Sequence, residues 1–250
     1  MQYKYAREQQ DYSDLSNGRV FYSLPGHPAF PVRLASEIFQ RCLGHREAIH
    51  KTSMPCTLYD PCCGLAYHLS VLAYLHGESI REVIGSDIDE KAVELAGRNL
   101  SLLHNTGLDR RIHELLELFE QYEKESHREA LQSAFLLREK LSGFPNSLAT
   151  RVFRASATDR DEISKQIKPH SVDIVFTDVP YGRHSQWRQA ELPEGSNPLT
   201  SMLNVLLDVL SLSSIVAIAS DKGQKVVHER FQRIEHFQVG KRRVVILKPI

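Results

Sequence analysis

A glycine turn and an acid about 20 residues after it are the first residues in this chain that could bind a nucleoside-like ligand. The turn is the motif Asp60-Pro61-Cys62-Cys63-Gly64, which follows a short apolar run. Its glycine would let the backbone approach a ligand closely, whereas a glycine alone would indicate only a tight turn. Asp87 ends the next apolar run, where an acid can bind ribose hydroxyls, and Ile88 follows it. Asp89 is the alternative acid, and one of the two could instead cap the next helix.

The turn does not contain the Gly-x-Gly-x-x-Gly pattern that holds a pyrophosphate, because Leu65 and Ala66 follow Gly64. A dinucleotide such as NAD is therefore disfavoured as the ligand. The residues instead indicate an adenosine-containing ligand without phosphates.

A third motif, Thr177-Asp178-Val179-Pro180-Tyr181-Gly182, ends the clearest buried strand of the chain. The Asp178 carboxylate and the Val179 carbonyl could accept hydrogen bonds from an amino or imino group of a planar heterocycle. Tyr181 would stack on that ring, a contact worth ~1–3 kcal/mol for a nucleic-acid base. The competing interpretation is a plain strand-end turn, in which Pro180 and the glycine only end the strand. The order and spacing of all three elements favour the functional interpretation.

The loop after this motif mixes basic and aromatic residues, which suits a site that takes a flipped base and its phosphates. Its candidates are Arg183, His184, Trp187 and Arg188, and an ordinary polar loop explains them equally well. Further phosphate contacts could come from two basic clusters, although each alone is more often solvated surface. These clusters are Lys222 with Lys225, and Lys241-Arg242-Arg243.

Charge and cysteine usage limit the class of protein. Lys+Arg and Asp+Glu both number 31 in 250 residues, so only a local basic patch could steer nucleic acid. The cysteines fit neither a zinc pattern nor a disulfide framework, being Cys42, Cys56, Cys62 and Cys63. We therefore expect a reducing, cytoplasmic setting and no metal site. A monomer is expected as well. No membrane segment is expected, because the N-terminus is polar and the apolar window at 205–219 is too short and too polar.

The elements that must position these motifs alternate between short strands and helices. Strands are predicted at residues 57–60, 83–87, 151–154, 172–178 and 214–220. Helices are predicted at about residues 34–43, 69–75, 93–103, 161–167 and 199–210. This alternation predicts an α/β, Rossmann-like fold with an open, mostly parallel sheet. Two late runs, 234–239 and 242–247, predict a terminal antiparallel hairpin joined through Gly240.

A helical insertion interrupts the alternation at about residues 109–145, where two charged amphipathic helices are expected with no strand between them. The first is expected to carry a solvated acidic face that does not lie on phosphate. That face comprises Glu114, Glu117, Glu120, Glu123 and Glu125. Residues 1–250 are interpreted as one domain, with an N-terminal extension over about residues 1–30.

Together, these motifs resemble those of S-adenosylmethionine-dependent methyltransferases. The glycine turn looks like motif I of amino-methyltransferases, and Asp178-Val179-Pro180-Tyr181 resembles their (Asp/Asn)-Pro-Pro-(Tyr/Phe) motif IV. From Gly18 onward the chain is more similar still to the avilamycin-resistance rRNA methyltransferase (AviRa) family, above all at residues 25–41. This resemblance implies a class I methyltransferase fold with S-adenosylmethionine as donor. It also implies a guanine nitrogen of 23S ribosomal RNA as acceptor, and resistance to an antibiotic of the avilamycin type.

The resemblance also implies a role for each matching residue. The cofactor would be held by Asp60, Pro61, Cys62, Cys63, Gly64, Asp87 and Ile88. Catalysis would fall to Asp178, Pro180 and Tyr181. Within motif IV, Val179 would contact the substrate. The other substrate-binding candidates rest on their basic or aromatic character and not on the resemblance: Arg183, Trp187 and Arg188.

The chain departs from these patterns in three places. Leu65 and Ala66 replace the Ser-Gly or Gly-x-Gly that often follows, which tightens the turn. Val179 replaces the first proline of motif IV, so its carbonyl is held less rigidly. Ala157 stands where an acid would touch the adenine amino group, which leaves Asp159 as the candidate. Motif IV alone also leaves open a DNA adenine, a protein amide, or a binding protein that has lost catalysis.

Overall fold

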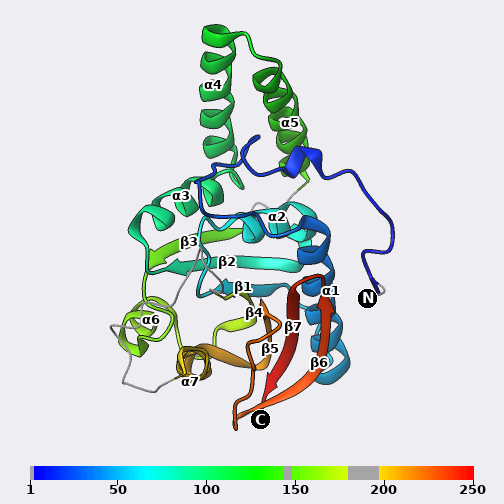
Figure 1. Ribbon diagram of the computed structural model, residues 1–250, viewed down its shortest axis with the longest axis vertical. Coiled ribbons are helices and arrows are strands. Elements are labelled where there is room, and N and C mark those ends of the chain that lie inside the picture. Colours follow the sequence, from blue (N-terminus) through cyan, green and yellow to red (C-terminus); the bar gives the residue numbers. More distant parts are fainter. Residues whose placement is uncertain (1–2, 144–147, 180–196) are drawn as a thin grey trace.

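The computed structural model describes residues 3–143, 148–179 and 197–250, and within them one seven-stranded sheet forms the centre of the molecule (Figure 1). Its strand order is β3-β2-β1-β4-β5-β7-β6. The strands are β1 (Cys56–Asp60), β2 (Ile80–Asp87), β3 (Ala149–Arg154), β4 (Val172–Asp178), β5 (Leu210–Asp221), β6 (Phe231–Val239) and β7 (Arg242–Pro249). β1 to β5 pair in parallel, whereas β7 runs antiparallel to β5 and β6. The predicted Rossmann-like α/β fold with a terminal hairpin is therefore confirmed.

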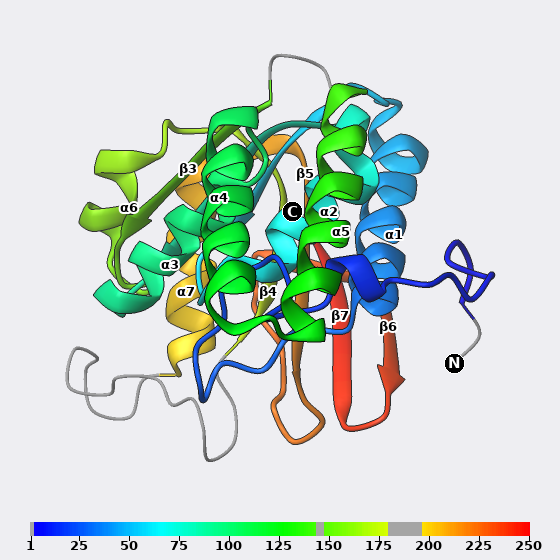
Figure 2. The ribbon, with the colours of Figure 1, turned by 90° about the horizontal axis from the view of Figure 1, so that it is seen from above.

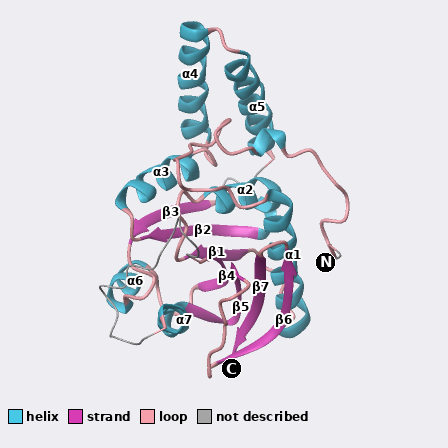
Figure 3. Ribbon diagram, viewed as in Figure 1, coloured by secondary structure: helices cyan, strands magenta, loops and turns pink. Residues whose placement is uncertain are grey.

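Helices cover both faces of this sheet (Figure 3). They are α1 (Val32–His50), α2 (Tyr67–His76), α3 (Glu90–Ser101), α4 (Asn105–Tyr122), α5 (Glu125–Ser142), α6 (Arg160–Gln166) and α7 (Pro198–Val209), with short 3-10 turns at Ser13–Leu15 and Gly77–Ser79. α1, α2 and α3 pack over one face, whose core includes Phe39 and Phe176. α6 and α7 cover the other face, over Tyr59 and Val175. Because β1 and β4 are covered on both faces, they read in the sequence as nearly continuous apolar runs.

The segment before α1 packs into the core of the α1–α3 face. Val20 and Phe21 are fully buried there. Asn99 of α3 ties the segment down: its side chain accepts from the Tyr22 N–H at 2.8 Å and donates to the Tyr22 carbonyl at 3.0 Å. The same Asn99 amide donates to the Leu65 carbonyl at 2.9 Å, so the N-terminal segment is linked to the turn after β1.

α4 and α5 form a helical hairpin that projects away from the sheet (Figure 1), and the predicted insertion is confirmed. The expectation of a solvated acidic face is wrong for Glu114. Its carboxylate accepts from the Tyr22 hydroxyl at 2.8 Å and from Arg98 and Arg111 at 2.9 and 3.0 Å. Glu123 and Glu125 do not lie on this face either, because α4 ends at Tyr122 and Glu125 begins α5.

The carboxyl ends of the parallel strands meet at one edge of the sheet, and we call it the carboxyl edge. Asp60, Asp87, Asp178 and Asp221 end β1, β2, β4 and β5 there. Asp221 pairs with Arg242, so β7 begins at the same edge. Figure 2 shows the loop after β5 and the β6–β7 turn side by side at this edge. Open α/β sheets bind their ligands outside the carboxyl ends of the strands, so the site is sought here.

Candidate functional site

The turn after β1 is held in place by hydrogen bonds to both of its flanking strands. Asp60 is fully buried, and its carboxylate accepts from the Cys62 N–H at 2.9 Å. The Cys63 N–H donates to the Ser86 carbonyl of β2 at 2.9 Å. Gly64 has a φ of +51°, a left-handed conformation that glycine adopts most readily, and its N–H donates to the Asp87 carboxylate at 2.8 Å. These hydrogen bonds therefore fix the turn against β1 and β2.

Cys63 packs between the turn and β2. A Cβ added to Gly85 would stand 2.9 Å from the Cys63 sulfur, a separation that side chains do not tolerate. Burial raises the pKa of the Cys62 and Cys63 thiols well above the usual range, so both stay protonated. These cysteines therefore serve packing, and thiolate chemistry is not expected of them.

The two acids after β2 have different roles. The Asp87 carboxylate accepts from the N–H of Gly64 at 2.8 Å and from the N–H of Asp89 at 3.0 Å. Asp89 caps α3, because its carboxylate accepts from the Ala92 N–H at 3.0 Å. The alternative that one of the pair is a helix cap is thus confirmed for Asp89. Asp87 remains the candidate that faces the carboxyl edge.

Asp159, the candidate for the adenine amino group, caps α6. Its carboxylate accepts from the Glu162 N–H at 2.9 Å, and the residue is exposed. Ala157 is 8 % exposed and packs in the core beside α6. The local contact made by Asp159 fully accounts for its position, so the contact with adenine stays a prediction.

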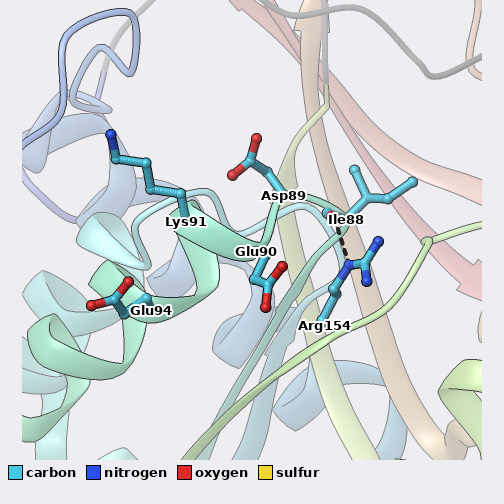
Figure 4. A pocket seen from close by; sticks show the side chains of 6 residues that line it. All are labelled: Ile88, Asp89, Glu90, Lys91, Glu94 and Arg154. Atoms are coloured by element: carbon cyan, nitrogen blue, oxygen red, sulfur yellow. Dashed lines mark hydrogen bonds between the residues drawn. The ribbon is translucent and has the colours of Figure 1, made fainter.

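A hollow of about 480 Å³ lies between the α3 N-terminus and β3 (Figure 4). Its lining is Ile88, Asp89, Glu90, Lys91, Glu94 and Arg154. Figure 4 shows the Arg154 side chain reaching up to the Ile88 backbone, where its Nε donates to the carbonyl at 3.2 Å. The lining is mostly charged, and Ile88 is the apolar side chain among these six residues.

A buried polar group lies beneath the carboxyl edge, between β1 and β4. The His68 Nε2 atom is 3.2 Å from an Asp60 oxygen and 3.4 Å from the Phe176 carbonyl. Burial lowers the pKa of His68, so its ring is neutral at pH 7 and the contact with Asp60 is not a full ion pair. Burial also raises the pKa of Asp60 to about 7, and the charge of Asp87 adds to this shift.

Asp178 ends β4 with its side chain about one quarter exposed. The Arg242 Nε atom at the start of β7 lies 4.0 Å from an Asp178 oxygen. The Val179 N–H donates to the Ala219 carbonyl at 3.0 Å, which fixes the backbone after Asp178 against β5. Arg242 was a candidate phosphate contact in the sequence, but the structure turns it inward toward Asp178.

Of the predicted site residues, the structure brings Asp60, Pro61, Cys62, Cys63, Gly64, Asp87, Ile88, Asp178 and Val179 to the carboxyl edge. The other catalytic and substrate-binding predictions lie outside the described residues: Pro180, Tyr181, Arg183, Trp187 and Arg188. Sequence reasoning missed two residues near this edge: His68, on which the charge of Asp178 acts, and Phe30, whose ring centre is 5.1 Å from the Arg242 guanidinium carbon. A histidine on an apolar helix looks like an ordinary core residue. Phe30 lies within residues 25–41, where the family resemblance is strongest, but no motif there gave it a role.

The described residues contain no cluster of three or more His, Cys, Asp or Glu side chains that could hold a metal ion. In the same part of the chain, no helix has the length and apolar character needed to cross a membrane.

The architecture is that of a Rossmann-like methyltransferase. The features that define it are the strand order, the terminal antiparallel hairpin, the glycine turn after β1 and the acid that ends β2. A family model described as rRNA methyltransferase AviRa matches residues 1–242. The chain therefore belongs to the AviRa rRNA methyltransferase family.

Known proteins support this assignment. A curated protein of Streptomyces viridochromogenes, named 23S rRNA (guanine(2535)-N(1))-methyltransferase, is 38% identical over 246 residues, or 98% of this chain and 95% of that protein. A solved structure of rRNA methyltransferase aviRa from the same organism superposes with a TM-score of 0.87 at 38% identity, covering 99% and 96% of the two chains. TrmN from Thermus thermophilus shares the fold alone, with a TM-score of 0.51, 17% identity, and 90% of this chain against 50% of that one.

Proposed function

We propose that the protein transfers a methyl group from S-adenosylmethionine to a guanine ring nitrogen, N1, of 23S ribosomal RNA. The observation that carries the proposal is the meeting of the Gly64–Asp87 turn and Asp178 at one edge of the sheet. Family membership, and the substrate named for the relative from Streptomyces viridochromogenes, support the choice of rRNA. The cytoplasm follows as the expected location, because that is where such an RNA is found.

The residues of the turn fit S-adenosylmethionine. Among the described atoms, a Cβ built on Gly64 would meet only the His27 ring, at 3.6 Å, so the backbone there is open to a ligand. The first turn of α2 has no side-chain cap within the described chain, which leaves its N–H groups available to a carboxylate. Asp87 would hold the ribose hydroxyls, and Ile88 would contact the adenine ring. Bound S-adenosylmethionine would supply an electrophilic methyl group.

Asp178 would accept the proton of the guanine nitrogen. N1 of guanine is a poor nucleophile while it carries its proton, so a carboxylate that takes the proton raises its electron density. Help of this kind contributes ~10²–10⁴-fold to a rate. The hydrogen bond from the Val179 N–H to β5 would keep the Asp178 backbone fixed during the transfer. Tyr181 remains the proposed stacking partner of the base.

Basic side chains at the same edge would hold the RNA backbone. Lys222 and Lys225 are exposed on the loop after β5, and Lys241 is exposed on the β6–β7 turn. Arg243 is half-buried next to that turn. We call these four residues the basic rim. Since the net charge of the chain is zero, this local charge is what would draw phosphates to the edge.

Transfer of tritiated methyl from S-adenosylmethionine tests the proposal. Bare 23S rRNA, ribosomal subunits, DNA and protein extract are offered in parallel, and the labelled nucleoside is identified. We expect label only in the rRNA arms, as N1-methylguanosine. If DNA or protein is labelled instead, that molecule is the substrate and not RNA. If the protein binds S-adenosylmethionine but labels none of the four substrates, it is a binding protein and not an enzyme. Avilamycin resistance of a host that expresses the active protein, but not of one that lacks it, would establish the resistance role.

A further inference from the structure

Arg242 joins the terminal hairpin to the end of β4 across the intervening strand β5. Its Nε atom is 4.0 Å from an Asp178 oxygen, and both side chains are 25% exposed. At this separation the contact is a charge attraction and not a hydrogen bond. Partial burial excludes part of the water that would otherwise screen such a pair.

Phe30, from the loop before α1, fixes where the Arg242 guanidinium lies. The guanidinium carbon is 5.1 Å from the centre of the Phe30 ring. Phe30 itself is only 4% exposed and packs edge-on against Phe176 at 5.4 Å. Its other neighbour is the His68 ring at 5.9 Å. The arginine therefore rests on the buried Phe30 ring. Phe30 in turn packs on Phe176, which lies two residues before Asp178 on β4.

We propose that Arg242 is a positioning residue, which holds the Asp178 carboxylate charged and directed at the methyl-acceptor base. A guanidinium stays charged at every relevant pH, and a cation within a few ångströms favours the charged form of an acid. Within the described part of the chain, the titratable groups near Asp178 are His68 of α2 and Cys62 of the turn, and an Asp60 oxygen lies 3.2 Å from the His68 ring. The charge of Asp178 acts on both His68 and Cys62. Among these described groups Arg242 carries the positive charge, because burial lowers the pKa of His68 and leaves its ring neutral at pH 7.

This inference rests on the proposed role of Asp178 in methyl transfer. It differs from the sequence-based expectation that Arg242 contacts phosphate. An arginine that binds phosphate would change the affinity for RNA, whereas one that positions Asp178 would change the rate of the transfer step and its dependence on pH.

The test compares Arg242→Met and Arg242→Lys with the control Lys248→Met, which removes one charge from the opposite end of β7. Single-turnover methyl transfer is measured from pH 5 to 9 with saturating S-adenosylmethionine and saturating rRNA, and unfolding temperatures are recorded. For Arg242→Met we expect the acidic limb of the rate profile to move up by about one pH unit, with a rate loss on the order of 10-fold below it. Arg242→Lys should restore most of this rate, and Lys248→Met should match the parent.

Two results would overturn the inference. In the first, Arg242→Met keeps the parental rate and pH profile but weakens RNA binding and lowers its salt dependence, as a phosphate contact would. In the second, Arg242→Lys is as slow as Arg242→Met, so the charge is not what matters. Asp178→Asn separates this inference from the proposed function. If Asp178→Asn keeps the full rate, the role of Asp178 fails; if it is slow while Arg242→Met is normal, only the inference about Arg242 fails.

Discussion

Replacing Asp87 by asparagine should weaken both the turn after β1 and the binding of S-adenosylmethionine. The carboxylate accepts two backbone N–H groups, from Gly64 at 2.8 Å and from Asp89 at 3.0 Å. An asparagine offers one acceptor oxygen, and its amide nitrogen would face the second donor. One charge-assisted hydrogen bond is therefore lost, at about 1.5–3 kcal/mol. Because the same atoms support the ribose contact, we expect donor affinity to fall on the order of 10-fold or more.

Titration calorimetry with S-adenosylmethionine measures the affinity, and thermal unfolding of the free protein measures the cost to the turn. Asp89→Asn is the matched control, because it makes the same chemical change two residues away. Asparagine caps a helix as well as aspartate does, so this control should keep both affinity and stability. Equal affinities for Asp87→Asn, Asp89→Asn and the parent would show that Asp87 does not serve the donor site.

Three further perturbations test other parts of the site. Gly85→Ala should cost ~1–3 kcal/mol of stability in thermal unfolding, because its Cβ would meet the Cys63 sulfur at 2.9 Å; unchanged stability would show that the turn can yield. Burial raises the pKa of Asp60 to about 7, so the free energy of unfolding should fall as pH rises from about 4 to about 7. Asp60→Asn should remove this fall. An identical pH profile for both proteins would refute the raised pKa of Asp60. Neutralising the four residues of the basic rim should reduce the slope of log RNA affinity against log salt by the share of up to about four phosphate contacts. The control Glu117→Gln with Glu120→Gln should not weaken RNA binding. The reverse pattern would place the RNA on α4.

The sign of the Asp60 prediction follows from its raised pKa. Between pH 4 and 7 the buried carboxyl of the folded protein keeps its proton, while the same group in the unfolded chain has lost it. The folded state thus binds more protons over this range, and raising the pH favours unfolding. Above about pH 7 the contribution is constant.

Much of the fold could be predicted from the sequence, because its signals are local. The buried run of β4 was predicted with the bounds that the structure shows, and the hairpin through Gly240 was placed correctly. The spacing of Gly64 and Asp87 also predicted that both belong to one ligand site, and the hydrogen bond between them shows that they lie together, while the ribose contact stays a prediction. Period and spacing along a chain report such features directly.

The remaining features depend on contacts between distant segments. Glu114 looked like part of a solvated face, but Tyr22, Arg98 and Arg111 converge on it from elements that only the fold brings together. Arg242 looked like one member of a basic surface cluster, because the sequence does not show which face of β7 it occupies. A one-residue change of register would exchange Arg242 and Arg243 between the two faces.

The most direct test of the central claim is single-turnover methyl transfer to 23S rRNA by Asp178→Asn and Asp178→Ala at saturating S-adenosylmethionine. Asparagine keeps the shape of the side chain but cannot take the proton, so we predict a rate at least about 100-fold below the parent. Donor affinity, measured separately, should stay nearly constant, because the hydrogen bonds that hold the turn run to Asp60, Ser86 and Asp87. A fully active Asp178→Asn would rule out proton acceptance by this carboxylate, and a fully active Asp178→Ala would show that the active site lies elsewhere.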